Sequence, residues 1–241
     1  EITPVVFINQ RIFAETDSLE IRGLSHKIVN FVTKKIEQGG KTSFGELQLD
    51  CDWTKSSRDK FFYLLEYIQT LPELKDVTVS STLRLHQVKN IKTSGIPPVK
   101  KVTLMCYNMG NLRLFGDHNS ILNDNDLKTY LSESLRNYPL EIDIALPIFD
   151  WFVAFRDNKY IGISKHVDES DLENKSLFTQ NPKTELFLLN QNLEKANLFK
   201  GDVIRHEFVT KEQLIKTAKF LTKELKGKEG KIIFYHLDSE T

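Results

Sequence analysis

Two aspartates separated by a single residue are the sharpest chemical feature of the chain. Asp50 and Asp52 flank Cys51 at the end of a short run with the alternation of a β-strand. Alternate residues of a strand point to the same face, so the two carboxylates lie side by side. Two close negative charges raise the pKa of one carboxyl group, which suits acid–base chemistry or substrate orientation. The alternative is an ion-pair network in which Arg84 neutralises both.

Other polar and aromatic side chains collect where further predicted strands end, the position of working residues in parallel α/β folds. Arg84 and His86 share one strand face, where they either contact a ligand or pair with the aspartates. Tyr107 either bonds a ligand or fills the interior. The remaining residues of this kind include Trp53, Gln87, Asn108, Asp150, Trp151, His206, Glu207 and Asp238. Their convergence on one rim predicts a site for a polar ligand.

Two aromatic residues just beyond strand ends could contact a sugar. Aromatic planes stack on sugar rings, so Trp53 and Trp151 fit such a ligand, although an aromatic residue after a strand is more often a packing residue. Glu207 and Asp238 are candidate catalytic carboxylates, or else solvated or ion-paired groups.

The chain lacks the usual signatures of metal and nucleotide binding. Asp50, Asp52, His86 and His206 could hold a metal ion, but no ligand spacing such as HExxH supports this set. No P-loop, GxGxxG or GxSxG occurs. We therefore expect no metal and no cofactor.

Composition indicates an ordinary globular protein and excludes several classes. The chain has 241 residues, 40% apolar and 27% charged, which excludes global disorder. Its 33 basic residues balance 33 acidic ones, so a nucleic-acid partner is disfavoured. No apolar run approaches the ~18 residues of a membrane span. Two cysteines make no disulfide scaffold, and the strand alternation predicts Cys51 and Cys106 as buried, inert thiols.

Strand-like and helical segments alternate along the chain. Strands are expected over residues 4–9, 46–52, 77–88, 102–109, 141–149, 203–208 and 231–237. Helices are expected after Asp17, after Ser56 or Ser57, from Asp124 or Asp126, and after the capping box of Thr210 and Gln213. Strands that alternate with helices require crossover connections and therefore form a parallel sheet.

This pattern predicts a TIM-type (β/α)8 barrel as a single domain over residues 1–241. Seven strands are counted where a closed barrel needs eight, so we expect one or two N-terminal strands to be missing from this chain. Residues 151–163 predict a β-hairpin insertion with Asp157 and Asn158 at its turn. Residues 165–185 are polar and aperiodic, which predicts a loop or an insertion.

Two short motifs resemble the family-18 glycoside hydrolases, the chitinase-like barrels. That family carries Asp-x-Asp-x-Glu at the end of its fourth strand and Met-x-Tyr at the end of its sixth. Asp50 and Asp52 match the two aspartates, and Met105 with Tyr107 matches the later motif.

The chain also resembles an uncharacterised bacterial family of chitinase-like barrel proteins. The similar blocks are DCDWT, TLRLHQ, GIPPV, YNMG and ALPIFDW, at residues 50–54, 82–87, 95–99, 107–110 and 145–151. The resemblance spans most of residues 4–210. It implies strands before the first one seen here, and an export or lipoprotein signal, hence a place in the cell envelope or periplasm.

One departure from the family pattern affects the chemistry. Thr54 stands where the signature glutamate protonates the leaving oxygen, and a threonine hydroxyl is no acid near neutral pH. Asp50, Asp52 and Tyr107 carry over as candidate site residues, but the mechanism does not. If hydrolysis survives, Glu207 or Asp238 must donate the proton.

We expect a diverged glycoside hydrolase that acts on a carbohydrate at the C-terminal rim of its strands. The alternatives are a glycan-binding protein without the catalytic acid and an envelope scaffold component whose polar rim is purely structural. The candidate catalytic residues are Asp50, Asp52, Tyr107 and Glu207. The candidate substrate-binding residues are Trp53, Arg84, His86, Gln87, Asn108 and Trp151. The expected partner is a carbohydrate, and the oligomeric state stays open.

Overall fold

The computed structural model describes residues 2–225 and 229–236. Asp238 and the end of the strand predicted over residues 231–237 lie outside the described residues. The chain divides into two compact units. The first comprises Glu1–Met105, Tyr130–Ala145 and Thr222–Ile233, and the second comprises Cys106–Thr129, Leu146–Leu221 and Phe234–Thr241. The expectation of one barrel domain over residues 1–241 stays a prediction.

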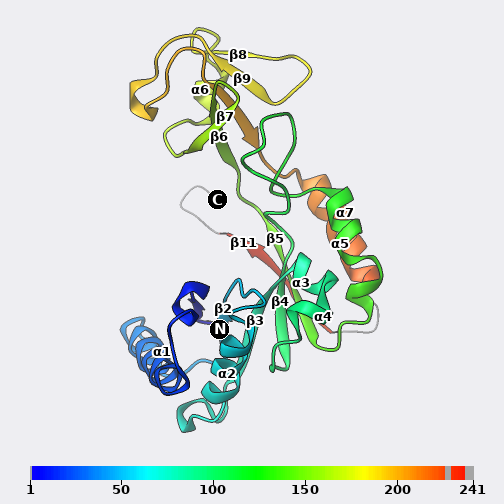
Figure 1. Cartoon of the computed structure of the whole chain (residues 1–241). Helices are drawn as coiled ribbons and strands as arrows, with labels where there is room; N and C mark the ends of the chain where they lie inside the picture. The colour runs from blue at the N-terminus through cyan, green and yellow to red at the C-terminus, as the bar shows by residue number, and fades with distance from the viewer. Residues whose placement is uncertain (1, 226–228, 237–241) are drawn as a thin grey trace. The chain divides into compact units, whose positions relative to one another are not determined.

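A parallel sheet is the framework of the first unit (Figure 1). Its strands, in spatial order, are β1 (Val5–Phe7), β2 (Glu46–Asp50), β3 (Thr78–Arg84), β4 (Lys101–Met105), β5 (Glu141–Pro147) and β11 (Ile232–Tyr235). The pairings from β1 through β5 are all parallel. A parallel sheet with helical crossovers confirms the predicted α/β fold class. Six of its strands lie among the described residues, against seven counted from the sequence.

Helices connect and flank these strands. The longer ones are α1 (Ser18–Gln38), α2 (Arg58–Ile68), α5 (Asp124–Arg136) and α7 (Lys211–Glu224). The short ones are η1 (Gln10–Phe13), η2 (Pro72–Leu74), α3 (Leu85–Lys89), α4 (Ile91–Ser94), α6 (Glu169–Glu173) and η3 (Glu194–Ala196). No helix in the described part of the chain is both long and apolar enough to cross a membrane.

Two helix starts are capped as predicted, whereas α2 begins after Ser57 without a side-chain capping hydrogen bond. Asp17 and Glu20 form a capping box at α1, and Thr210 and Gln213 form the predicted one at α7. At α5 the capping oxygen comes from Asn123, whose side chain accepts from the N–H groups of residues 125 and 126 at 2.9 and 3.2 Å. The sequence pattern predicted that the helix starts from Asp124 or Asp126. Asparagine caps a helix as well as aspartate does, so Asn123 takes this place instead.

Alternation divides the parallel sheet into an apolar and a polar face. The apolar face carries side chains such as those of Leu47, Leu49, Val79, Leu83, Val102 and Leu104, all buried. On the polar face the side-chain amide of Gln48 donates to the Thr103 hydroxyl at 2.7 Å. Lys101 lies there between the carboxylates of Glu46 and Asp143, at 2.5 and 3.0 Å. The interior of this partial barrel is therefore filled by hydrogen-bonded polar groups.

Two strands end four residues earlier than the sequence pattern predicts. The strand expected over residues 77–88 ends at Arg84, where α3 begins, and the one expected over residues 102–109 ends at Met105. Leu85 and Val88 are buried in α3. The alternating pattern predicted too long a strand over residues 77–88, because the same apolar residues can be buried equally well in a single helical turn.

The second unit contains an antiparallel sheet. In spatial order its strands are β7 (Lys159–Ser164), β6 (Trp151–Arg156), β10 (Val203–Glu207), β9 (Leu186–Leu189) and β8 (Phe178–Gln180). The predicted hairpin is confirmed as β6 and β7, and Asp157 and Asn158 take the positive φ values that its turn requires.

Two expectations are wrong in this unit. Residues 203–208 were expected to supply a strand of the parallel barrel, but β10 pairs antiparallel with β6 and β9. Residues 165–185 were expected to be an aperiodic loop or insertion, but they contain α6 and β8. Alternation identifies a strand without identifying its partner, which is decided by contacts distant in sequence.

Candidate functional site

The first unit presents a carboxylate pair where β2 ends. Asp50 accepts a hydrogen bond from the Thr82 hydroxyl at 2.7 Å. Burial raises the pKa of the Asp50 carboxyl group, and the negative charge of Asp52 raises it further, against the opposing effects of Thr82 and Arg84. A raised pKa is what the spacing of the aspartates predicted, although burial rather than the like charge is its larger cause.

Asp52 is held in a two-point ion pair with Arg84. The guanidinium Nε donates to one carboxylate oxygen of Asp52, and Nη2 donates to the other at 2.6 Å. The Asp52 side chain remains 41% exposed and that of Arg84 31% exposed. The predicted ion-pair network therefore forms at Asp52, while Asp50 keeps a carboxyl group that is harder to ionise.

Two predicted ligand contacts lie in the core. Trp53 is only 2% exposed, stacks on Phe61 with ring centroids 5.4 Å apart, and donates its indole N–H to the carbonyl of Ser94 at 2.9 Å. Gln87 is 1% exposed and bridges the backbone N–H of Arg84 to the carbonyl of Trp53. This placement favours packing and positioning for both side chains, because neither can present a surface to a ligand.

The other groups near the pair are weak acids or bases. Thr54 is exposed, and its hydroxyl lies 3.0 Å from that of Ser56. The pKa of the His86 imidazole is lowered, chiefly by desolvation and then by the Arg84 guanidinium, so the ring is neutral at pH 7. Burial raises the pKa of the Cys51 thiol to about 12, in line with an inert thiol.

The second unit contains an open cavity of about 1180 Å³ with aromatic and polar walls. Its lining includes Asn108, Phe149, Asp150, Trp151, Tyr235 and His236. Tyr107 lies parallel to Tyr235, with ring centroids 4.7 Å apart, and Phe149 packs edge-on against both. Aromatic faces combined with a few polar groups are the typical lining of a small-molecule site.

Glu207 lies behind this cavity as a buried anchor. Its first carboxylate oxygen accepts from Arg205 at 2.7 Å, and its second accepts from Trp151 Nε1 at 3.0 Å and from both the backbone N–H and the hydroxyl of Ser120. Both side chains of the Arg205–Glu207 pair are 1% exposed. A carboxylate that is sealed from solvent and accepts from this many donors fits a structural role better than that of a proton donor.

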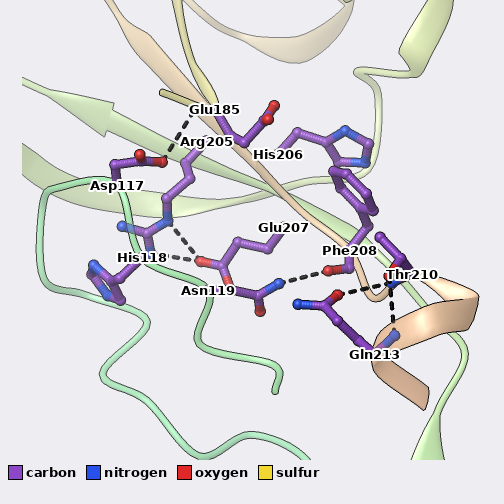
Figure 2. Close-up of a pocket in the computed structure, with 10 residues that line it drawn as sticks. All are labelled: Asp117, His118, Asn119, Glu185, Arg205, His206, Glu207, Phe208, Thr210 and Gln213. Carbon is purple, nitrogen blue, oxygen red and sulfur yellow. Dashed lines mark hydrogen bonds and ion pairs between the residues drawn. The ribbon is translucent and has the colours of Figure 1, made fainter. Parts of the chain in front are cut away.

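A smaller polar cavity of about 440 Å³ adjoins this pair (Figure 2). Several polar groups around it are engaged with one another. Asp117 accepts from the backbone of Glu185 at 3.1 Å, and the side-chain amide of Asn119 donates to the carbonyl of Phe208 at 2.6 Å.

The predicted site residues thus fall into two groups. The structure brings Asp50, Asp52, Arg84 and His86 to one place in the first unit. It brings Asn108 and Trp151 to the wall of one cavity in the second unit. Tyr107 stacks on Tyr235 of that wall, and Glu207 accepts a hydrogen bond from Trp151. Phe149 and Tyr235 were not among the predicted site residues, although both lie where predicted strands end. His236 was among the polar groups expected at the rim. Residues that could hold a metal ion are Asp150, Glu169 and His206.

Known proteins resemble this chain in structure but not in sequence. No model of a protein family matches it, and no curated protein matches it. The spore cortex-lytic enzyme SleL of Bacillus megaterium aligns with a TM-score of 0.58 and 12% identity, over 98% of this chain and 56% of SleL. Chitinase variants from Cycas revoluta, described as class V and as GH18 and bound to (GlcNAc)3 and (GlcNAc)4, give the same score and identity over 97% of this chain and 75% of theirs.

This is the fold of the GH18 chitinases. The chitinase-like agglutinin RobpsCRA from Robinia pseudoacacia also shares it, with a TM-score of 0.50 and 13% identity over 99% of this chain and 77% of the agglutinin. The predicted fold, a (β/α)8 barrel present in part, is therefore confirmed. The chain spans only about half of SleL, and at these identities the likeness is one of fold.

The placement of Trp53 predicts a large stability effect. Trp53→Ala removes a buried, stacked indole, so we expect the free energy of unfolding to fall by about 3–5 kcal/mol. Urea denaturation followed by circular dichroism measures this loss, with Phe31→Ala, at an exposed aromatic residue, as the control. A loss below about 1 kcal/mol would contradict the core placement.

The buried ion pair of Arg205 and Glu207 predicts a second stability effect. Glu207→Gln leaves the Arg205 guanidinium buried without its counter-charge, so we expect a loss of about 3–5 kcal/mol in the free energy of unfolding. The control is Glu185→Gln, an exposed carboxylate near the same cavity. Equal stability of the two variants would mean that Glu207 is not the anchor its contacts suggest.

The raised pKa of Asp50 predicts that the variant Asp50→Asn gains stability in a pH-dependent way. A folded-state pKa above the unfolded one means that ionisation of Asp50 opposes folding as the pH rises through the folded value. Asp50→Asn should therefore be at least as stable as the parent at pH 7, and this advantage should vanish as the pH falls toward about 4. Chemical denaturation across this range measures the difference. A less stable variant at pH 7 would show that the ionised Asp50 supports the fold.

Proposed function

We propose that the chain is a carbohydrate-binding protein built on the chitinase-like fold, without the catalytic acid of its enzymes. The observation that carries the proposal is the chemistry at the end of β2. Thr54, at the place of the family's glutamate by sequence resemblance, offers only an exposed hydroxyl. By the same resemblance, Asp52 is the aspartate that orients the substrate. Here it is held in an ion pair by the Arg84 guanidinium. Neither group can protonate a leaving oxygen.

The cavity of the second unit supports binding. Trp151, Phe149 and Tyr235 supply aromatic faces, and Asn108 and Asp150 supply polar groups at the same wall. The indole of Trp151 is fixed by its hydrogen bond to Glu207, so little conformational entropy is lost when a sugar ring stacks on it. Because chitinases of this fold bind (GlcNAc)3 and (GlcNAc)4, oligosaccharides of N-acetylglucosamine are the first ligands to test.

A diverged glycoside hydrolase is the second candidate. The observation that favours it is the raised pKa of Asp50, since a carboxyl group that stays protonated longer can act as a general acid. In this alternative Asp50, rather than Glu207, donates the proton. An envelope scaffold would be favoured by the absence of both binding and hydrolysis.

Glycan titration tests the proposal. We expect (GlcNAc)4 to bind the parent protein in calorimetry and Trp151→Ala to weaken that affinity at least tenfold, because the stacking face is removed. Trp151→Phe should retain more of the affinity, since it keeps an aromatic face and loses only the indole N–H. Phe31→Ala is the control, and thermal melts establish that each variant is folded.

Product analysis separates binding from hydrolysis. Mass spectrometry after prolonged incubation should detect no new reducing ends. If the parent protein forms products and Asp50→Asn does not, the chain is a hydrolase and the binding-protein proposal fails. Unchanged affinity in Trp151→Ala would contradict the cavity as the binding site.

A further inference from the structure

We infer that the second unit holds a site for a divalent transition-metal cation, formed by Asp150, Glu169 and His206. The three residues come from separate segments: the turn before β6, the start of α6, and β10. One oxygen from each carboxylate and one ring nitrogen of His206 all lie within 4.8 Å of one another. This set is distinct from the carboxylate pair of the first unit, and it does not depend on the proposed glycan binding.

The imidazole of His206 is a preorganised ligand. Its side chain is 8% exposed. The ring stacks flat on Phe152, with centroids 4.5 Å apart and an interplanar angle of 10°, and it also packs against Phe208 at 5.0 Å. Its Nε2 points at Asp150 Oδ2, 2.7 Å away. Because the ring is clamped in this orientation, placing Nε2 at a metal ion costs little conformational entropy.

The two carboxylates complete the site from the solvent side. Asp150 and Glu169 are both exposed and both line the 1180 Å³ cavity, so a hydrated ion can reach them. Two negative charges held this close repel each other unless a cation lies between them. Lys195, a cation at the same cavity, is engaged with Asp171 at 2.7 Å. The position between Asp150, Glu169 and His206 therefore favours a cation from solution.

The donor set selects the class of cation. One imidazole nitrogen with two carboxylates suits zinc and its borderline neighbours, whereas calcium takes six to eight oxygen ligands. In a tetrahedral zinc site, ligand atoms about 2.1 Å from the metal lie roughly 3.4 Å apart. A bound zinc ion would draw the three ligand atoms to that spacing by side-chain rotation and leave the fourth position to water. The bound ion would join α6 to β10 and fix Asp150 beside Trp151.

Zinc titration of the whole chain, prepared without a polyhistidine tag, tests the inference. We expect one zinc ion to bind per chain at pH 7.5 in competition with a chromophoric chelator, and thermal unfolding to shift to higher temperature on binding. Glu169→Gln and Asp150→Asn should each lower the affinity at least tenfold. Both change exposed side chains, so the fold should survive. Glu173→Gln, an exposed glutamate at the other end of α6, is the matched control and should bind as the parent does.

Two results would overturn the inference. One is the absence of zinc binding by the parent protein. The other is zinc binding of the same affinity in Glu169→Gln and Asp150→Asn as in the parent, which would place the ion elsewhere. In either case the contact between His206 and Asp150 is a hydrogen bond or ion pair only. Titrations with (GlcNAc)4 in excess chelator keep this outcome separate from the proposed glycan binding.

Discussion

The register between β6 and β10 positions the candidate groups of the second unit. Glu207 lies opposite Trp151, and His206 lies opposite Phe152. Since side chains alternate between the faces of a sheet, one face carries Trp151 and Glu207 and the other carries Phe152 and His206. Trp151 is thereby bonded to a buried carboxylate, and His206 is stacked on an aromatic ring. A shift of one residue would exchange the two faces and expose the Arg205–Glu207 pair.

The same alternation produces the polar interior of the first unit. Burying polar side chains is unfavourable unless they are paired, and here Gln48, Thr103 and Lys101 find partners on other strands of the sheet. Asp50 continues this face toward the strand ends, where it meets Thr82. A partly buried carboxyl group at the margin of a hydrogen-bonded interior has a raised pKa without any second charge. This explains why burial contributes more at Asp50 than the neighbouring aspartate does.

Local patterns predicted the elements well and their partners poorly. The strands from β2 to β5, the hairpin and the capping boxes follow from alternation, turn residues and caps, which are properties of neighbouring residues. The antiparallel pairing of β10 and the burial of Trp53 depend on Phe61, Ser94 and β6, all distant in sequence. For the same reason the proximity of Asp50 and Asp52 could be predicted, whereas the anchoring of Trp151 by Glu207 and the meeting of Asp150 with Glu169 could not.

The polar network of the first unit bears on whether catalysis survives. A general acid must release its proton toward the substrate and recover it, so it needs an open path and few competing donors. Asp50 has one strong donor, Thr82, and a raised pKa, whereas Glu207 has four donor groups and no exposure. Asp50 is partly exposed, and its pKa is shifted toward the protonated form. Any hydrolysis by this chain would therefore depend on Asp50. If the chain binds glycans without hydrolysing them, the ion pair between Arg84 and Asp52 would explain the lack of hydrolysis.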